Sequence, residues 1–388
     1  MERMMVEHKN ALKQLRTSWL VYALCVVIFL SLGFFVLSYY WQPGYAGLWL
    51  ALSSAVLAYE LWVFWKNLKE NFRLSDQALL PELGAGNVAS LARGALIGGL
   101  FGFLILPPPP GWLAWAPGVL YTIAVLIDFV DGYLARLTNH VTRLGEILDM
   151  YFDGLGMLAA VILIVRYDQA PAWYLLIGLG RYIFLAVLWL WQRLGKTVHE
   201  LPPSNRRRGL AGLQMGFVFV MLLPLFSPPG THVAALGFGI PFLVSFIYDG
   251  LIAIGILPAD AGRRFPAMKD VAMRIAPVAL RLAAVALLAW HLLAAKPGGY
   301  VLPGWIFWGQ AVVLLLIALG AAGRLAAILG MGLLGFYQKV LPLTASHYVL
   351  VFIFIALVIL GTGAFSLWKP EDRLLYRRAG ERLPPHVE

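Results

Sequence analysis

The amino-acid sequence predicts an all-α, polytopic membrane protein with about twelve transmembrane helices. Hydrophobic residues occupy 61% of its 388 positions and charged residues only 13%, about half the charged share of a soluble domain. Apolar runs of about twenty residues, each long enough to cross a bilayer as a helix, recur along the whole sequence. The single cysteine, Cys25, lies in the first run, so the sequence predicts neither an intrachain disulfide nor a thiolate metal site.

The predicted spans are separated by turns, several of them rich in proline. Pro107–Pro110, Pro228–Gly230 and Pro297–Gly299 interrupt the apolar pattern, because proline lacks the N–H that a helix interior requires. The first run is of full spanning length and lacks a clear cleavage site, which favours a membrane helix over a secretory signal. The spans lie near residues 17–40, 45–65, 88–106, 113–135, 147–166, 172–192, 210–227, 232–256, 277–295, 304–322, 324–342 and 346–368.

The distribution of positive charge predicts the orientation in the membrane. The formal net charge is +10, and the lysines and arginines gather in alternate loops rather than along one surface. Positively charged loops stay in the cytoplasm, so we expect both termini, and the aspartates on either side of the loop between the fourth and fifth spans, at the cytoplasmic face of an inner membrane. The same distribution argues against nucleic acid as a partner.

We expect three membrane parts and a tail. Residues 1–81 would form two leading transmembrane helices and an interfacial helix between Lys66 and Pro81, where charged and leucine residues mix. Residues 82–256 would form a six-helix catalytic core. Residues 277–368 would form a four-helix membrane unit of unknown role, and residues 369–388 a basic cytoplasmic tail.

Four aspartates lie at the ends of the fourth and fifth predicted spans. Asp128 and Asp131 are three residues apart, and Asp149 and Asp153 are four apart, so each pair shares one helix face. Two such helices, side by side and antiparallel, would bring the four carboxylates into one small volume. Ionisable side chains in membrane segments are costly and mark functional sites. Clustered carboxylates need cations, and all-oxygen ligands favour Mg²⁺ or Mn²⁺.

The aspartates belong to a longer motif. The pattern D-x2-D-G-x2-A-R-x8-G-x3-D-x3-D runs without a break from Asp128 to Asp153. It resembles the hallmark of the CDP-alcohol phosphatidyltransferase family, with the resemblance covering about residues 82–256. The resemblance implies transfer of a phosphatidyl or related phospho-lipid group from a CDP-linked lipid, such as CDP-diacylglycerol, to an alcohol. CMP would be released, as a step of phospholipid synthesis.

The resemblance also implies roles for the four carboxylates. Asp128, Asp131 and Asp149 would hold a pair of divalent ions, Mg²⁺ or Mn²⁺, with Asp153 as a further ligand. Asp153 would also act as the general base that takes the proton of the acceptor hydroxyl. Two metals can bridge and neutralise a diphosphate, and phosphoryl transfer depends mainly on positioning and charge stabilisation. Direct attack is the preferred mechanism, and a covalent intermediate stays open.

By the same resemblance, four neighbouring positions would bind the donor. Gly132 and Ala135 are small residues that would let the cytidine nucleotide lie close to the helix. Arg136 would contact donor phosphate, and Gly145 would keep the second helix close to the nucleotide.

The opening of the third predicted span also resembles the family. Asn87-Val-Ala-Ser90-Leu-Ala-Arg93 is similar to the family's N-x-x-T-x-x-R opening, with serine in place of threonine. Arg93 would face the site and bind phosphate there, or it would extend to the interface as a snorkelling side chain.

Four further arginines are candidates for binding the acceptor or its phosphate. Arg181, within the sixth predicted span, would bind an anionic group of the acceptor or pair with a carboxylate. Arg206, Arg207 and Arg208 open the seventh span and stand where the family carries lysines. We expect this cluster to bind phosphate or anionic head groups, or to anchor the loop on the cytoplasmic side.

Other interpretations and partners stay open. A membrane prenyltransferase also binds a diphosphate through paired aspartates, and a transporter or scaffold would use the carboxylates to bind ions. The acceptor alcohol is undetermined, with a slight preference for a phosphorylated one, and a homodimer in the lipid bilayer is plausible. Gly361–Leu367 gives the C-terminal unit a weak resemblance to DoxX-like membrane proteins. Glu60 and Asp249 are lone carboxylates within predicted spans, without an assigned role.

Overall fold

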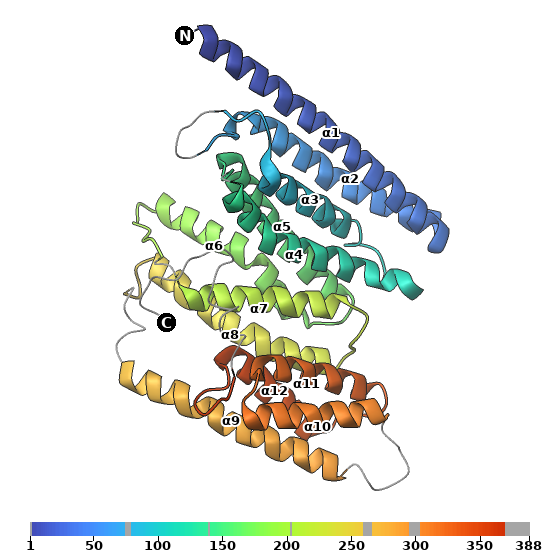
Figure 1. Ribbon diagram of the computed structural model, residues 1–388, viewed down its shortest axis with the longest axis vertical. Coiled ribbons are helices and arrows are strands. Elements are labelled where there is room, and N and C mark those ends of the chain that lie inside the picture. Colours follow the sequence, from blue (N-terminus) through green and yellow to red (C-terminus); the bar gives the residue numbers. More distant parts are fainter. Residues whose placement is uncertain are drawn as a thin grey trace. The chain divides into compact units, whose positions relative to one another are not determined.

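The computed structural model describes residues 2–73, 79–138, 140–201, 204–258, 266–294 and 303–368 (Figure 1). The chain is 79% helical, and no strand occurs among the described residues, so the all-α prediction is confirmed. Twelve α-helices form there. Within the described ranges, seven helical segments are long and apolar enough to cross a membrane, which indicates an integral membrane protein. The number of twelve spans stays a prediction.

The helices group into two compact units, which we describe separately. Among the described residues, the first unit comprises residues 2–167 with Val218–Pro224, and the second comprises Asp168–Phe217 with residues 225–368. The first contains α1 (Glu2–Tyr40), α2 (Pro43–Lys66), η1 (Leu68–Glu70), α3 (Gly84–Phe101), η2 (Gly111–Trp115), α4 (Ala116–Leu137) and α5 (Arg143–Arg166). The others are η3 (Ala172–Tyr174), α6 (Leu175–Arg193), α7 (Asn205–Leu222), α8 (Gly230–Ala253), α9 (Pro266–Ala294), α10 (Gly304–Leu319), α11 (Gly323–Gln338) and α12 (Ala345–Leu360).

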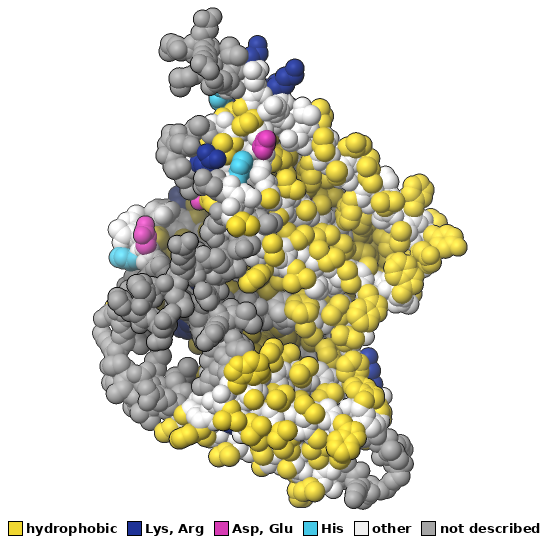
Figure 2. Space-filling view, viewed as in Figure 1, with side chains coloured by type: hydrophobic (Ala, Val, Ile, Leu, Met, Phe, Trp, Pro, Cys, Tyr) yellow, Lys and Arg dark blue, Asp and Glu magenta, His cyan; other side chains and the backbone are white. Residues whose placement is uncertain are grey.

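Hydrophobic side chains cover much of the visible surface (Figure 2). On α1, Leu20 is 61% exposed and Phe35 is 68% exposed. Exposing such an apolar helix face to water would be unfavourable, whereas lipid tails are as apolar as these side chains. The exposed surface therefore fits the membrane location that the composition predicts.

Helix α3 is the central element of the first unit. It packs against α2, α4 and α5, while α1 packs against α2. Glycines on α3 allow these approaches: a Cβ atom at Gly98 would overlap Leu57 of α2, and one at Gly86 would lie 2.7 Å from the Cβ of Ala135 on α4. Small residues let membrane helices pack backbone to backbone, so α3 can contact three neighbours at once.

The lone carboxylate of α2, Glu60, has a partner that the sequence did not reveal. The Tyr22 hydroxyl of α1 lies 2.5 Å from Glu60 Oε1 and 2.9 Å from the carbonyl oxygen of Leu91 on α3. Glu60 is buried, and a Cβ at Gly94 of α3 would overlap its carboxylate. A buried polar group is stable only with such partners, so this contact ties both leading helices to α3.

The sequence predicts an interfacial helix between Lys66 and Pro81, and the structure differs from this expectation. In the described part of this segment the chain forms only the short η1, followed by an antiparallel bridge between Phe72 and Leu79. The cause is Asn71, which is fully buried and whose Nδ2 donates to the carbonyl oxygens of Leu80, at 3.0 Å, and Glu82, at 2.8 Å. An asparagine side chain that bonds nearby carbonyls favours a turn over a helix.

In the second unit, α9, α10, α11 and α12 pack so that each contacts two of the others, and α12 also packs against α8. The buried Arg281 of α9 donates to carbonyl oxygens at the ends of neighbouring helices, among them Ile317 at 3.1 Å and Ala318 at 2.9 Å. A cation at helix C-termini is favourable. The proposed division into three parts stays a prediction, and the tail, residues 369–388, lies outside the described residues.

Candidate active site

The aspartates of α4 and α5 converge within the first unit. Asp128, Asp131 and Asp149 each offer a carboxylate oxygen, and these three oxygens all lie within 4.8 Å of one another. Asp128 and Asp131 occupy one turn of α4, whereas Asp149 comes from α5. Asp153 is not a member of this group of three, but it approaches the same cation, Arg93.

Arg93 of α3 lies among all four carboxylates. Its Nη2 is 2.7 Å from Asp149 Oδ1, and its Nη1 is 3.2 Å from Asp153 Oδ1 and 3.8 Å from Asp131 Oδ2. Nη1 also pairs with Asp128. The Arg93 side chain is only 3% exposed, whereas a snorkelling arginine would place its head group in water. Arg93 therefore faces the site, and its guanidinium offsets the mutual repulsion of the carboxylates.

One face of α3 presents the residues of its opening motif to α4 and α5. Ser90 Oγ lies 3.2 Å from Asp131 Oδ2, and Gly86, one turn earlier, meets Ala135. A Cβ at Gly86 would also lie 3.2 Å from the Asp131 carbonyl oxygen. Ala135 is therefore small because α3 packs there. The nucleotide contact expected for Ala135 stays a prediction.

The start of α5 is fixed by a buried polar network. Thr142 is the N-cap of α5, and its Oγ1 accepts from the Gly145 N–H at 3.2 Å. Asn87 of α3 donates through Nδ2 to Thr142 Oγ1 at 2.9 Å and to Asn71 Oδ1 at 3.0 Å. A Cβ at Gly145 would lie 2.6 Å from Asn87 Oδ1. Capping and close packing thus hold the helix turns that carry Asp149.

The sequence motif did not indicate this network fully. Asn87 belongs to the motif that opens α3, but its partners Asn71 and Thr142 lie 16 and 55 residues away in sequence. The signal that could have found Thr142 is its place before the first turn of a helix, where threonine is a favoured cap. Gly86 carried no signal, because its role depends on the contact with α4.

Two further donor-binding candidates lie on α4, beside the aspartates. Gly132 is half-buried and follows Asp131 directly, whereas the side chain of Arg136 lies outside what the structure describes. The contacts expected between these two residues and the donor therefore stay predictions.

The four acceptor-binding candidates belong to the second unit. Arg181 is on α6, and Arg206, Arg207 and Arg208 lie in the first turn of α7. Arg206 and Arg208 are exposed, but Arg207 is half-buried, and its backbone N–H lies 3.5 Å from Ser204 Oγ. The cluster is thus not one uniformly exposed basic patch, because successive residues of a helix point in different directions. The approach of all four arginines to the aspartates stays a prediction.

Within the second unit, Arg206 pairs with the lone carboxylate of α8. Arg206 Nη2 is 2.9 Å from Asp249 Oδ1, and its guanidinium lies 5.0 Å from the ring centre of Tyr248. The Asp249 side chain is only 12% exposed. A largely buried carboxylate needs such a partner, so Arg206 has a structural task in addition to any phosphate that it would bind.

The donor set suits a hard divalent cation. The group of three consists only of carboxylate oxygens, which Mg²⁺ and Mn²⁺ prefer to nitrogen or sulfur ligands. Two of the three side chains stay accessible, with Asp128 30% exposed and Asp149 49% exposed. The residues present therefore fit the metal site that the motif predicts.

Comparison with known proteins identifies the segment that carries this site. Residues 84–254 match the model of a family described as CDP-alcohol phosphatidyltransferase. This match includes all of α3, α4 and α5, and therefore each of the four aspartates and Arg93. The family resemblance of the motif is thus confirmed for this part of the chain.

Several curated proteins resemble the same part of the chain. A CDP-diacylglycerol–glycerol-3-phosphate 3-phosphatidyltransferase of Bacillus subtilis is 39% identical over 108 residues, which cover 24% of this chain and 54% of the relative. A CMP-forming cardiolipin synthase of Streptomyces coelicolor is 35% identical over 105 residues, 26% of this chain and 48% of the relative.

A plant protein shows that the similarity extends beyond these two activities. Choline/ethanolaminephosphotransferase 2 of Arabidopsis thaliana is 39% identical over 66 residues, 17% of each chain. The chain thus spans about half or less of the curated relatives that it matches. No solved structure matches the chain.

Proposed function

We propose, from the match of residues 84–254 to the model of the CDP-alcohol phosphatidyltransferase family, that this chain transfers a phosphatidyl or related phospho-lipid group. The donor would be a CDP-linked lipid, the acceptor an alcohol, and the second product CMP. The observation that carries the proposal is the convergence of three carboxylate oxygens within 4.8 Å, inside the matched segment. A curated relative named as a phosphatidyltransferase and another named as a CMP-forming cardiolipin synthase support the reaction class.

Asp128, Asp131 and Asp149 are the residues that would hold divalent cations. Bound there, Mg²⁺ or Mn²⁺ would neutralise the charge of the donor diphosphate and thereby stabilise the leaving CMP. Arg93 keeps the carboxylates together before the donor binds, because it pairs with each of them. The donor-binding roles of Gly132, Ala135, Arg136 and Gly145 belong to this proposal.

Asp153 is the residue that we propose as the general base. It lies one turn from Asp149 on α5, outside the group of three, and its side chain is 36% exposed. A base must reach the proton that it takes, so partial exposure suits an acceptor arriving from water. Asp153 would take the hydroxyl proton while the acceptor oxygen bonds to the lipid-bearing phosphorus. The bond from that phosphorus to the CMP oxygen then breaks.

The membrane would give the donor and the acceptor separate routes to the site, and the arginines would bind the acceptor. The acyl chains of the donor would enter sideways from the bilayer, and the polar acceptor would come from the cytoplasm, where the positive loops place this end of the helices. An acidic group of the acceptor, most simply a phosphate, would bind to arginines, namely Arg181, Arg206, Arg207 and Arg208. The chain would work as a homodimer, and the four-helix unit would stabilise it.

The test is a panel of alcohols offered to the purified full-length protein. CDP-diacylglycerol and Mg²⁺ or Mn²⁺ would be supplied with glycerol 3-phosphate, inositol phosphate, serine or a lipid alcohol, and CMP release would be followed. We expect metal-dependent CMP release with one of these acceptors. Release of pyrophosphate from a prenyl diphosphate, or ion transport into liposomes without any CMP release, would contradict the proposal.

A further inference from the structure

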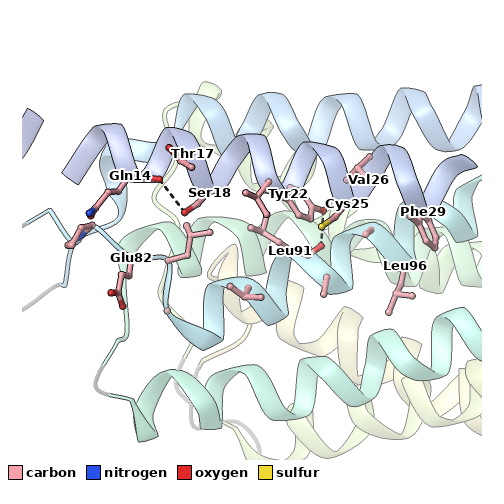
Figure 3. A pocket seen from close by; sticks show the side chains of 17 residues that line it. Gln14, Thr17, Ser18, Tyr22, Cys25, Val26, Phe29, Glu82, Leu91 and Leu96 are labelled. Carbon is pink, nitrogen blue, oxygen red and sulfur yellow. Dashed lines mark hydrogen bonds between the residues drawn. The ribbon is translucent and has the colours of Figure 1, made fainter. Parts of the chain in front are cut away.

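A groove runs between α1 and α3 of the first unit (Figure 3). Its volume is about 890 Å³, within the range of about 300–1,000 Å³ that is typical of ligand pockets. Val21 and Val88, on its rim, are 57% and 54% exposed. Since the surrounding surface is apolar, this groove would open toward lipid.

The groove changes from polar to apolar along its length. Figure 3 shows Gln14, Thr17 and Ser18 near one end and Phe29 and Leu96 near the other. From Thr17 to Phe29 the helix rises about 18 Å, at ~1.5 Å per residue. A polar end joined to an apolar channel of this length matches a lipid with its head group and one acyl chain.

The polar end offers hydrogen-bond acceptors. Thr17 Oγ1 donates to the carbonyl oxygen of Lys13 at 3.2 Å, and Ser18 Oγ donates to that of Gln14 at 3.3 Å. Each hydroxyl has a single hydrogen, so its oxygen is left to accept. Glu82, also in the lining, adds an exposed carboxylate. No lysine or arginine lines the groove within the described part of the chain.

We propose that this groove binds an aminophospholipid of the ethanolamine type. One acyl chain would lie between α1 and α3, and the ammonium group would donate to Glu82 and the hydroxyl oxygens. The charge of the lining favours a zwitterionic head group with N–H donors over one of net negative charge, because the latter has no ammonium to pair with Glu82 and meets no lining cation. A choline head group has the same charge but no N–H donors, so it would bind less well.

The lipid site is separate from the candidate active site. Leu91 and Ala92 line the groove, whereas Ser90 and Arg93 face the aspartates; on a helix these pairs point in different directions. Tyr22 also lines the groove, and its hydroxyl lies 2.9 Å from the Leu91 carbonyl oxygen of α3. A bound lipid would therefore contact the residue that ties α1 to α3.

Cys25 is a natural probe of occupancy, because it lines the groove and is the single cysteine of the chain. The full-length protein would be placed in nanodiscs of ethanolamine or choline phospholipid, and the rate of maleimide alkylation would be measured. Protection scales as 1 + [L]/Kd, and we expect alkylation to be slowed about fivefold or more by the ethanolamine lipid. Glu82→Gln should remove this difference between the two lipids.

A matched control separates occupancy from a general bilayer effect. Leu32→Cys in a Cys25→Ser background places the thiol on an exposed part of α1 outside the groove lining, and its rate should be the same in both lipids. Ala92→Trp should fill the groove and abolish the lipid dependence at Cys25. Equal rates at Cys25 in both lipids, equal protection by an anionic phosphatidylglycerol, or the same lipid dependence at the control position would each overturn the proposal.

Discussion

Asp153→Asn is expected to abolish CMP release while leaving metal-dependent binding of the CDP-linked donor largely intact. The amide keeps the shape of the side chain but cannot take a proton from the acceptor, and a general base contributes about 10²–10⁴-fold to the rate. Donor binding should persist because Asp153 is not a member of the group of three carboxylates. Single-turnover CMP release and equilibrium binding of labelled CDP-diacylglycerol measure the two effects separately.

Glu146→Gln is the matched control for this prediction. Glu146 lies on the same helix, but its carboxylate pairs with Arg143 at 2.9 Å and does not belong to the group of three converging carboxylates. This variant should release CMP at the wild-type rate. Full activity of Asp153→Asn would eliminate Asp153 as the base, whereas loss of donor binding along with activity would assign it to the metal ligands instead.

Arg93→Met is expected to destabilise the protein strongly in a chelator and much less in Mg²⁺ or Mn²⁺. The substitution removes the cation that pairs with four carboxylates. Breaking a fully buried ion pair costs about 3–5 kcal/mol. Here we expect about 2 kcal/mol, because Asp128, Asp149 and Asp153 are partly exposed and water screens them. A divalent cation that binds only the folded state would restore stability.

Thermal unfolding with and without chelator measures this effect, and Arg143→Met provides the control. Arg143 forms an exposed pair with Glu146, and its side chain is 51% exposed, so its loss should change stability by no more than about 0.5 kcal/mol. If Arg93→Met lost the same stability with and without metal, a divalent cation would not replace the Arg93 guanidinium among the aspartates, and the prediction would be wrong.

Much of the fold could be predicted because membrane helices are dictated by local composition. Each predicted span overlaps one of the described α-helices, since an apolar run in lipid must satisfy its backbone internally. The segment after Lys66 was harder. Its course depends on Asn71, whose side chain bonds carbonyls up to eleven residues away, and no periodicity reports such a contact.

The aspartate site was predictable for a similar reason. Spacings of three and four put carboxylates on one helix face. The only further assumption that the prediction needed was that α4 and α5 pack against each other. The placement of Arg93 was left open, because a snorkelling arginine and a buried one look alike in sequence. The partners of Glu60 and Asp249 are Tyr22 and Arg206, which lie 38 and 43 residues away on another helix, and tertiary packing brings each pair together.

The most decisive measurement is a titration of the purified protein with Mn²⁺, followed by electron paramagnetic resonance, with and without CDP-diacylglycerol. If the converging carboxylates hold cations that grip the donor diphosphate, Mn²⁺ should bind more tightly when the donor is present. Asp149→Asn should weaken Mn²⁺ binding by at least about tenfold, a loss that even an outer-shell partner can cause, while Glu146→Gln should not. Mn²⁺ binding that is the same in all three proteins, and indifferent to the donor, would contradict the proposed site.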